Sequence, residues 1–329
     1  MKILLSVPGH LKTVPMNEYV YQTLQTMGFE VRLFNFGAHD LRAKLLKKLS
    51  RNRYYHHMNR QVQKIADEFN PDVFLTIFGF DHDRTLIEYL RNRNIITVCW
   101  WLNDPFQLRR SLEKASFYDY YFTNAEGSVD EYRRQGIRNA HFLPVGAYPP
   151  VHRVLPDRAR QHDICFAGDW GPGREEVLTA LARDFRLSIW GPWKKHLDRR
   201  SLLQKCIVRD GFFTPEEMVV MFNRSRIVLN LHSWFGKYHF GINPRLFEAN
   251  GCGAFQLCDF KDEIPRLYEP GIEIALYTSI DDLRSKLSYY LGADNERTEI
   301  ALRGWRKTIE KHTYTNRLQE MFYNIKLKI

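Results

Sequence analysis

Several signatures that would place the chain in a special structural class are missing. The longest apolar run, residues 95–102, falls far short of the roughly 20 residues that span a bilayer. The five cysteines are odd in number and form no Cys-x-x-Cys pair, which argues against a disulfide framework and a structural zinc site. There is no repeat of about 20–50 residues and no low-complexity tract. These absences indicate a globular protein of a reducing compartment, and we expect a cytoplasmic location.

The composition fits a folded, basic chain. At roughly 150 residues per domain, 329 residues suggest two domains. The hydrophobic fraction of 44% and the aromatic fraction of 14% allow a solid core. Lys and Arg number 48 against 38 Asp and Glu, so the net charge is +10. This excess favours phosphates, nucleic acid or an anionic membrane face as partners, without choosing among them.

Short apolar runs alternate with amphipathic stretches, which is typical of an α/β fold with mostly parallel sheets. Residues 2–7 predict a first strand rather than a signal peptide, because Ser6 and Pro8 break the apolar run. Further strands are expected at 30–36, 73–78, 95–102, 118–124, 140–144, 163–167, 187–190, 227–231, 254–258 and 273–277. Helices are expected at 17–27, 61–69, 83–91, 128–135, 175–184, 215–223, 244–250, 279–291, 295–312 and 314–327.

This order of elements predicts two doubly wound, Rossmann-like domains that face a cleft. The first covers residues 1–150 and the second residues 151–312, with a Pro- and Arg-rich linker at 148–162. Residues 313–329 form a last helix that could cross back to the first domain. Open α/β sheets bind ligands at the carboxyl ends of their strands, so the candidate residues should follow strands.

The segment 227–259 gives the strongest indication of chemistry. Asn243 and Pro244 predict the cap and first position of a short helix after a buried strand. Such a helix start binds phosphate, and Arg245 can add its planar guanidinium. Glu248, on the same helical face, is placed to accept the two hydrogens of a ribose diol. The alternative is that Arg245 and Glu248 form an ordinary surface pair, and the residues alone leave both interpretations open.

A glycine-rich segment, residues 166–174, adds a second feature. Its glycines, beginning with Gly168, are spaced G-x-x-G-x-G rather than in the G-x-G-x-x-G order of a dinucleotide fold. A glycine loop followed by Arg174 at a helix start suits a diphosphate. Because strand-to-helix glycine loops are common, the segment indicates a phosphate pocket only together with Arg245.

Residues 243–257, NPRLFEANGCGAFQL, resemble the donor-binding segment of GT-B glycosyltransferases. More narrowly, they resemble the CgeB-like (spore maturation protein-like) family. The resemblance covers most of the chain: WWLNDP at 100–105 is similar to a Trp-x-x-Asp-x-Pro stretch of that family, and 122–144 and 166–168 fit as well.

The resemblance implies that Glu248 binds the ribose of a nucleotide. The chain departs from the broader Glu-x7-Glu signature, because Phe240 stands where the first Glu would be. The contact of that Glu with the donor sugar is therefore not implied, and neither is a retaining mechanism.

By the same resemblance, the chain is expected to be a hexosyltransferase-like enzyme that moves a sugar from a nucleotide-diphosphate sugar, with UDP favoured, to an unidentified acceptor. The domain of residues 1–150 would face the acceptor and that of residues 151–312 would bind the donor. No cofactor and no metal are expected, because a helix dipole with Arg and Lys can neutralise the leaving diphosphate. We therefore assign Arg245 and Arg174 to the diphosphate.

Other residues of the second half are candidates for the donor. Trp193 could border the base and Lys194 could reach a phosphate, although a basic surface turn explains both slightly better. In GT-B relatives the region of Phe212 and Phe213 holds the nucleobase, and one of the two is expected in the core. His232 is expected to touch the donor sugar or phosphate.

Two residues of the first half are candidates for the general base that deprotonates the acceptor hydroxyl. Asp104 follows the strand at 95–102 and has the family resemblance in its favour. Its alternative role is to cap the loop before Pro105. His10, at the Pro-Gly turn after the first strand, is the weaker candidate.

Residues 42–64 contain eight Lys or Arg and no Asp or Glu. Leu41, Leu45, Leu46 and Leu49 share one helical face, which suits docking at an anionic membrane, such as the inner membrane surface, or packing on the sheet. The stretch could instead bind an anionic glycan or polymer, or be a solvated basic face. A non-catalytic nucleotide-sugar-binding protein and an epimerase of the same fold are the alternatives to the transferase. A nucleic-acid-binding protein using this stretch ranks last, since no such fold signature is present.

Overall fold

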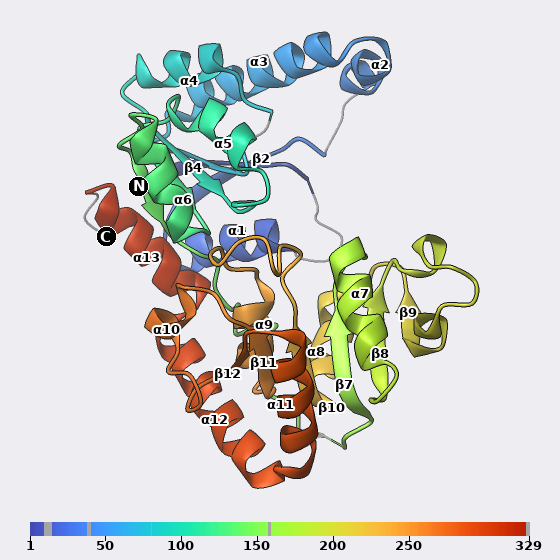
Figure 1. Ribbon diagram of the computed structural model, residues 1–329. Helices are drawn as coiled ribbons and strands as arrows, with labels where there is room; N and C mark the ends of the chain where they lie inside the picture. The colour runs from blue at the N-terminus through green and yellow to red at the C-terminus, as the bar shows by residue number, and fades with distance from the viewer. Residues whose placement is uncertain (10–14, 38–40, 80, 157–158, 327–329) are drawn as a thin grey trace. The chain divides into compact units, whose positions relative to one another are not determined.

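The computed structural model describes residues 1–9, 15–37, 41–79, 81–156 and 159–326, and the chain forms two compact units (Figure 1). The N-terminal unit contains the described residues up to 144 and those from 318 onward, and the C-terminal unit contains residues 145–317. Each unit is built on a six-stranded sheet. Among the described residues, no helix is long and apolar enough to cross a membrane.

The sheet of the N-terminal unit is parallel throughout, with strand order β2-β1-β3-β4-β5-β6. Its strands are β1 (Lys2–Val7), β2 (Glu30–Asn35), β3 (Val73–Ile77), β4 (Ile96–Trp101), β5 (Tyr120–Thr123) and β6 (Ala140–Phe142). The chain first moves from β1 to the edge strand β2 and then to β3 on the other side of β1. The order of connection therefore reverses between β1 and β3.

The sheet of the C-terminal unit is also parallel, with strand order β12-β11-β10-β7-β8-β9. Its strands are β7 (His162–Ala167), β8 (Leu187–Gly191), β9 (Ile207–Asp210), β10 (Ser225–Asn230), β11 (Gln256–Asp259) and β12 (Ala275–Tyr277). Here the order of connection reverses between β7 and β10. Two parallel sheets with this winding confirm the predicted α/β, doubly wound fold.

Helices connect the strands in both units. In the N-terminal unit they are α1 (Met16–Thr26), α2 (Leu41–Leu49), α3 (Arg51–Phe69), α4 (Arg84–Arg91), α5 (Leu108–Ala115) and α6 (Glu126–Arg134). From residue 172 onward they are α7 (Pro172–Leu181), α8 (Pro215–Asn223), α9 (Arg245–Gly251), α10 (Ile264–Leu267), α11 (Ile280–Gly292), α12 (Asp294–Lys311) and α13 (Tyr314–Asn324), with two short 3₁₀ turns at Lys194–His196 and Leu202–Cys206.

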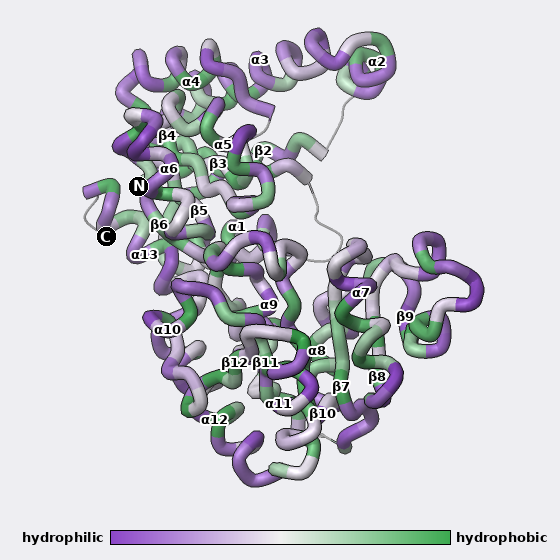
Figure 2. The backbone as a smooth tube through the Cα atoms, viewed as in Figure 1, coloured by the Kyte–Doolittle hydropathy of each residue, from purple (hydrophilic) through white to green (hydrophobic). Residues whose placement is uncertain are grey.

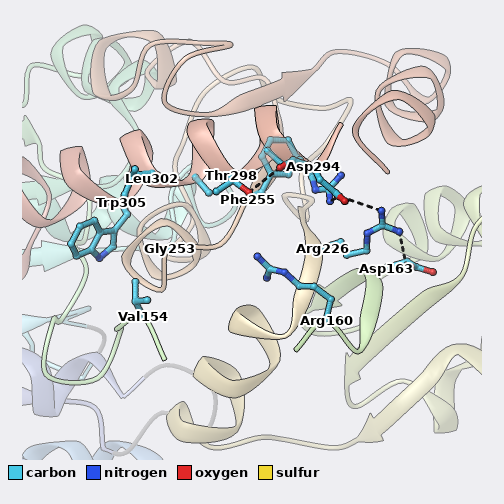
Figure 3. Close-up of a pocket in the computed structure, with 12 residues that line it drawn as sticks. Val154, Arg160, Asp163, Arg226, Gly253, Phe255, Asp294, Thr298, Leu302 and Trp305 are labelled. Carbon is cyan, nitrogen blue, oxygen red and sulfur yellow. Dashed lines mark hydrogen bonds and ion pairs between the residues drawn. The ribbon is translucent and has the colours of Figure 1, made fainter. Parts of the chain in front are cut away.

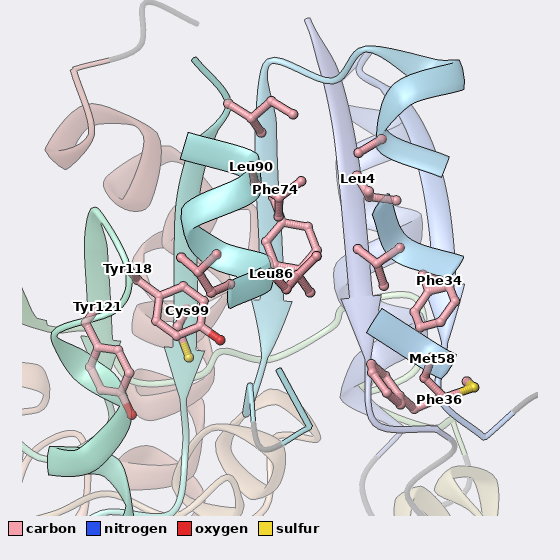
Figure 4. Close-up of a cluster of buried hydrophobic side chains, with 14 of the residues drawn as sticks. Leu4, Phe34, Phe36, Met58, Phe74, Leu86, Leu90, Cys99, Tyr118 and Tyr121 are labelled. Atoms are coloured by element: carbon pink, nitrogen blue, oxygen red, sulfur yellow. The ribbon is translucent and has the colours of Figure 1, made fainter. Parts of the chain in front are cut away.

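Each unit has a hydrophobic core of its own. Hydrophobic residues concentrate on the strands, whereas outer helices such as α4 are largely hydrophilic (Figure 2). In the N-terminal unit Leu4 of β1, Phe74 of β3 and Cys99 of β4 lie in one buried cluster with Leu86 of α4 (Figure 4). Burial on both faces explains why strands of a parallel sheet are continuous apolar runs.

Candidate functional site

The carboxyl ends of β7 and β10 form the switch point of the C-terminal sheet. These neighbouring strands pair in register, with Leu229 opposite Phe166. Successive connections leave β7 and β10 in opposite directions. Open α/β sheets bind ligands outside the carboxyl ends of the strands at such a switch point. Two of the predicted arginines lie here.

Arg174, in the first turn of α7, reaches back over the ends of both strands. Its Nε and Nη2 donate to the carbonyl oxygen of Leu231 at 3.1 and 2.9 Å, and its Nη1 donates to that of Asp169 at 3.0 Å. Burial lowers the pKa of Arg174 to about 10, and the positive charge of Arg245 adds to the lowering. Neutral carbonyl groups orient this guanidinium without cancelling its charge, so an anion would be favoured beside it.

Arg245 and Glu248 interact with each other on α9. The Nε of Arg245 donates to the carbonyl oxygen of Ala167 at the end of β7, 3.2 Å away, and its Nη1 forms an ion pair with Glu248. The two side chains are only 13% and 2% exposed. The alternative interpretation is therefore right about the pairing and wrong about a surface location. Binding of diphosphate and ribose by this pair stays a prediction.

Gly168 fixes the ends of two strands to each other. Its N–H donates to the carbonyl oxygen of Trp190, and its own carbonyl oxygen accepts from the indole N–H of Trp193 at 2.8 Å. A Cβ on Gly191, which has φ +143°, would lie 2.1 Å from that same oxygen. This close approach requires glycine at position 191.

Trp193 is fully buried in the core of the C-terminal unit. The prediction that it borders a nucleobase is wrong, because its ring packs on Phe166 and its N–H is used inside the protein. Lys194 is exposed, as a basic surface turn requires, and its backbone N–H donates to Asp210 at 3.1 Å.

Of Phe212 and Phe213, one lies in the core and the other is exposed, as the sequence predicted. Phe213 is 3% exposed and packs under the guanidinium of Arg245, 5.6 Å from the ring centroid. Phe212 is 41% exposed after Gly211, which has φ +99°. Phe212 is therefore the one of the two that a nucleobase could contact, whereas the core position of Phe213 makes its prediction as a stacking surface wrong.

His232 follows β10 and has both ring nitrogens engaged. Its Nδ1 lies 2.6 Å from Asp259, and its Nε2 lies 3.1 Å from the backbone nitrogen of Asn243. Because a backbone N–H can only donate, Nε2 accepts and the proton resides on Nδ1. Burial also lowers the pKa of His232, which keeps the ring neutral. The expected contact with the donor is therefore wrong, and His232 instead positions Asn243.

Asn243 contacts α9 without being its N-cap, since that position belongs to Pro244 and the helix spans residues 245–251 rather than 244–250. Its Oδ1 lies 3.3 Å from the backbone nitrogen of Leu246, and its Nδ2 donates to Asn230 at 2.7 Å. Asn243 thus ties the start of α9 to the end of β10.

Three buried charged residues, one at the end of β11 and two just after it, were missed by sequence reasoning. Asp259 accepts from His232, and Lys261 lies 2.9 Å from Asp259 while also donating to the carbonyl oxygen of Tyr238. Glu263 accepts from the N–H of Gly241 at 2.8 Å, and burial raises its pKa to about 7. All three side chains fix the loop that leads to α9. Charged residues after a strand ordinarily indicate a solvated turn, so nothing in the local sequence signals their burial.

Asp104, in the N-terminal unit, is fully buried. Its carboxylate accepts from Ser111, Thr123 and Tyr132 at 2.7–2.8 Å. Burial raises its pKa, against the opposing effect of these hydrogen bonds. A carboxylate enclosed by three hydroxyl donors cannot reach an acceptor, so its prediction as general base is wrong and it joins the loop after β4 to α5 and α6. His10 lies outside the described residues.

Asp81 and His82 follow β3 at the switch point of the first sheet. The Nε2 of His82 lies 2.9 Å from Ser6 of β1, and burial lowers its pKa to about 3. Asp81 is partly buried near Arg110 and Lys114 and hydrogen-bonds to Tyr55. Burial outweighs these partners and raises the pKa of Asp81. Sequence reasoning missed both residues, although they follow a buried strand.

Asp81-His82-Asp83 is also an Asp-x-Asp pattern, which the expectation of metal-free catalysis passed over. Asp83 caps α4 through a 2.8 Å hydrogen bond to the N–H of Leu86. Within the described ranges, the one group of three or more His, Cys, Asp or Glu residues with ligand atoms inside 4.8 Å of one another is His232, Cys258 and Asp259. Since both nitrogens of His232 are engaged, this group is a poor metal site.

Known structures share this architecture. Sucrose-phosphate synthase from Thermosynechococcus elongatus superposes with a TM-score of 0.72 at 12% identity, over 99% of this chain and 98% of that one. Anabaena HepE, solved in complex with UDP-glucose, superposes with a TM-score of 0.70 at 13% identity, over 99% of both chains. At such low identity the likeness establishes the fold, which is GT-B.

The sequence itself matches known families. Residues 174–322 match the family described as "Glycosyl transferase-like". The chain is 26% identical over 267 residues to spore protein CgeB of Bacillus subtilis (strain 168), covering 75% of this chain and 81% of that protein. The chain is a glycosyltransferase with the GT-B fold, and its sequence is similar to that of CgeB.

The family match begins at Arg174 and includes Arg245 and Glu248. In this glycosyltransferase the structure therefore brings three predicted residues together at one switch point. It removes Trp193, Phe213 and His232 from direct contact with a donor. What the sequence did not reveal is the charged cluster that holds the loop before α9.

Proposed function

We propose that this glycosyltransferase takes its sugar from a UDP-sugar and that the donor diphosphate binds between Arg174 and Arg245. The observation that supports this is the convergence of the two guanidiniums on the carbonyl groups of Leu231 and Ala167, at neighbouring strand ends. HepE, a structural neighbour, was solved with UDP-glucose. In our proposal Glu248 binds the ribose and Phe212 borders the base.

The same arginines supply the electrostatic part of the reaction. As the bond between sugar and diphosphate breaks, negative charge develops on the leaving phosphate, and fixed guanidiniums stabilise it without reorganising. In this proposal Arg245 turns from Glu248 toward the phosphate when donor binds, and Glu248 turns toward the ribose diol. We therefore propose that transfer proceeds without a metal, and we expect activity in the presence of a chelator.

On the acceptor side we propose Asp81 as general base, in place of Asp104. Asp81 lies at the switch point of its own sheet, and its raised pKa suits a group that must take up a proton. We expect Asp81→Asn to lower kcat by about 10²–10⁴-fold with unchanged UDP affinity. Asp130→Asn, which alters an exposed carboxylate, is the matched control.

The donor site is tested by thermal unfolding with UDP, GDP, ADP, dTDP and CMP. A ligand at about a hundred times its Kd adds roughly 2.7 kcal/mol to the free energy of unfolding. We expect UDP to raise the melting temperature, and Glu248→Gln and Arg245→Gln to reduce that rise. The control is Glu299→Gln, which breaks an exposed Arg–Glu pair on α12. No stabilisation by any nucleotide would overturn the proposal.

Turnover separates the transferase from its alternatives. We expect UDP release from a UDP-sugar to increase when an acceptor is added. A binding protein would be stabilised by UDP but release none, and an epimerase would convert the donor without an acceptor.

We further propose that α2 brings the enzyme to an anionic membrane. Leu41, Leu45 and Leu49 share one face of the helix and are 85%, 58% and 68% exposed. Ala43 and Leu46 face the core instead. Most of the surface of these three leucines is thus exposed among the described residues, as in helices that lie in a bilayer interface.

Cations flank these leucines on both sides of the helix. At 100° per residue, Arg42 follows the stripe on one side, and Lys44 and Lys48 precede it on the other. Each cation near an anionic surface adds about 1 kcal/mol of attraction. An anionic membrane accounts for both the cations and the exposed leucines, whereas an anionic glycan or polymer accounts for the cations alone.

Sedimentation with vesicles tests this contact. We expect binding to phosphatidylcholine vesicles only when phosphatidylglycerol is included, and a loss of more than tenfold on replacing the three exposed leucines of α2 by Ser. The control replaces Leu202 and Val208, which are similarly exposed in the C-terminal unit. The proposed membrane contact would be contradicted if both variants bound vesicles equally, or if short RNA displaced the protein from the vesicles at physiological salt.

A further inference from the structure

A cavity of about 710 Å³ opens in the C-terminal unit at the amino ends of β7 and β10 (Figure 3). Asp163 and Arg226 stand near the beginnings of these strands, whereas Ala167 and Leu231 stand at their ends. At about 3.3 Å per residue, five residues of β10 separate the cavity from Arg174's contact by about 17 Å. The cavity is therefore distinct from the donor site.

One end of the cavity is cationic. Arg160, Arg226 and Arg297 line it together with Asp163 and Asp294, so three positive groups face two negative ones. Arg226 lies 3.3 Å from Asp163 and 3.4 Å from Asp294, and Asp294, whose carboxylate is 71% exposed, also forms an ion pair with Arg297. The two pairs of Arg226 are long and partly exposed, so they contribute little and can be exchanged for another anion.

The positive charges of Arg160, Arg226 and Arg297 repel one another. Burial lowers the pKa of Arg297 to about 10, and the charges of Arg226 and Arg160 lower it further in the same direction. Arg160 also donates to the carbonyl oxygens of Asn223 and Ser225 at 2.8 and 2.6 Å. An incoming acid would find oriented donors and would relieve repulsion among the cations.

The other end of the cavity is apolar. Trp305 and Leu302 of α12 lie there beside Val154 and Gly253, away from the ion pairs of Arg226 (Figure 3). Leu302 is 42% exposed and Val154 36% exposed, although both are large apolar side chains. A pocket of this size that is apolar with a few convergent polar groups is typical of small-molecule sites.

We propose that this cavity binds an amphipathic anion, an acid or phosphate attached to an apolar chain or ring, independently of the nucleotide sugar. The acidic group would bind Arg226 and Arg160, and the apolar part would lie along Trp305 and Leu302. The chain or the ring could come from a lipid-like or an aromatic compound, and the test uses one of each.

Isothermal titration calorimetry of the full chain with decyl phosphate and 1-naphthyl phosphate tests the site. Inorganic phosphate and decanol, which correspond to the two parts of decyl phosphate, are titrated separately for comparison. We expect at least one of the two amphipathic phosphates to bind at least tenfold more tightly than inorganic phosphate or decanol does. The one that binds more tightly shows whether the ligand is lipid-like or aromatic. Saturating UDP should leave this affinity unchanged, whereas competition by UDP would place the ligand in the donor site and overturn the proposal.

Two variants locate the site. Arg226→Gln removes a cation, and Ala301→Trp introduces a large side chain into the lining of the cavity. We expect each to weaken binding at least tenfold while stabilisation by UDP, which reports folding, persists. Arg303→Gln, an exposed residue of the same helix that does not line the cavity, should bind as the wild type does. Equal affinity in all three variants would mean surface adsorption and would overturn the proposal.

Discussion

At the scale of single residues, the least predictable feature is the burial of charge. Arg174 and Glu248 were identifiable because they occupy recognisable positions after a strand and on a helix. Lys261 and Glu263 were not, because charged residues after a strand ordinarily indicate a solvated turn. Here each side chain is about 1–2% exposed and bonds to a backbone group of the preceding loop. Such long-range partners cannot be identified from local sequence.

Glu263 should make the stability of the protein depend on pH. Its pKa is raised from 4.5 to about 7 by burial, so the folded state retains a proton that the unfolded state releases. The stabilisation is complete below about pH 4.5 and is lost as pH rises through about 7. The loss amounts to about 3 kcal/mol at 1.36 kcal/mol per pKa unit.

Denaturant unfolding of wild type and Glu263→Gln between pH 4.5 and 8 measures this contribution of Glu263 to the free energy of unfolding. We expect the wild type to lose stability relative to the variant as pH rises, because the amide cannot ionise but can still accept from Gly241. Glu216→Gln, an exposed glutamate on α8, should follow the wild type. Parallel curves for wild type and Glu263→Gln would show that the carboxyl does not titrate in this range.

At the scale of elements, the buried strands were predictable and the exposed or charged elements were not. The strands β1, β3 and β4 are apolar runs, and their predicted bounds agree with the structure within one residue. The edge strand β9 (IVRD) was missed because it is largely exposed. Helix α5 was not predicted, because only Ser111 and Ala115 are buried and its apolar pattern is therefore weak.

Helix α3 shows how charge can hide an amphipathic pattern. The prediction began the helix at 61, yet it begins at Arg51. Tyr54, Met58, Val62 and Ala66 are buried at four-residue intervals, so one continuous stripe faces the core. Basic residues between them obscured the first two members of this stripe.

Gly304 offers a prediction about how α12 packs. Replacing glycine by alanine inside a helix ordinarily stabilises a protein by up to about 1 kcal/mol. A Cβ at Gly304, however, would lie 2.3 Å from the carbonyl oxygen of Glu273, so the helix must move away from that backbone. We therefore expect Gly304→Ala to destabilise the protein by about 1–3 kcal/mol, measured by denaturant unfolding.

Gly292, the last residue of α11, is the matched control. A Cβ there meets nothing within 4 Å, so we expect Gly292→Ala to be neutral or slightly stabilising. The same sign for both substitutions would contradict the close approach at Gly304.

At the scale of the whole molecule, the path of the chain could not be derived from periodicity alone. The sequence predicted a terminal helix over 314–327, and α13 spans residues 314–324. Residues from 318 onward belong to the N-terminal unit, although residues 145–317 of the C-terminal unit precede them. A helix pattern specifies a buried face but not the sheet that buries it.

Because the residues of α13 from 318 onward belong to the N-terminal unit, we expect this helix to stabilise that unit. Leu318, Met321 and Phe322 are fully buried, and the ring of Phe322 packs edge-to-face on Phe29 at 5.1 Å. Truncating a buried phenylalanine leaves a cavity, so we expect Phe322→Ala to cost about 3–5 kcal/mol. Tyr323, the next residue, is 83% exposed, and its replacement by alanine should change stability by no more than about 0.5 kcal/mol.

Hydrogen exchange resolves where the cost of Phe322→Ala falls. We expect protection to drop for the backbone amides of β1 and β2, which lie in the same unit as Phe29, while the amides of β7 and β10 keep theirs. UDP should still protect the loops around Arg174 and Arg245 in this variant, because the residues proposed to bind the donor belong to the other unit. An equal loss of protection in both sheets would instead show that the two units unfold as one, and that the terminal helix supports the donor site as well as the core it joins.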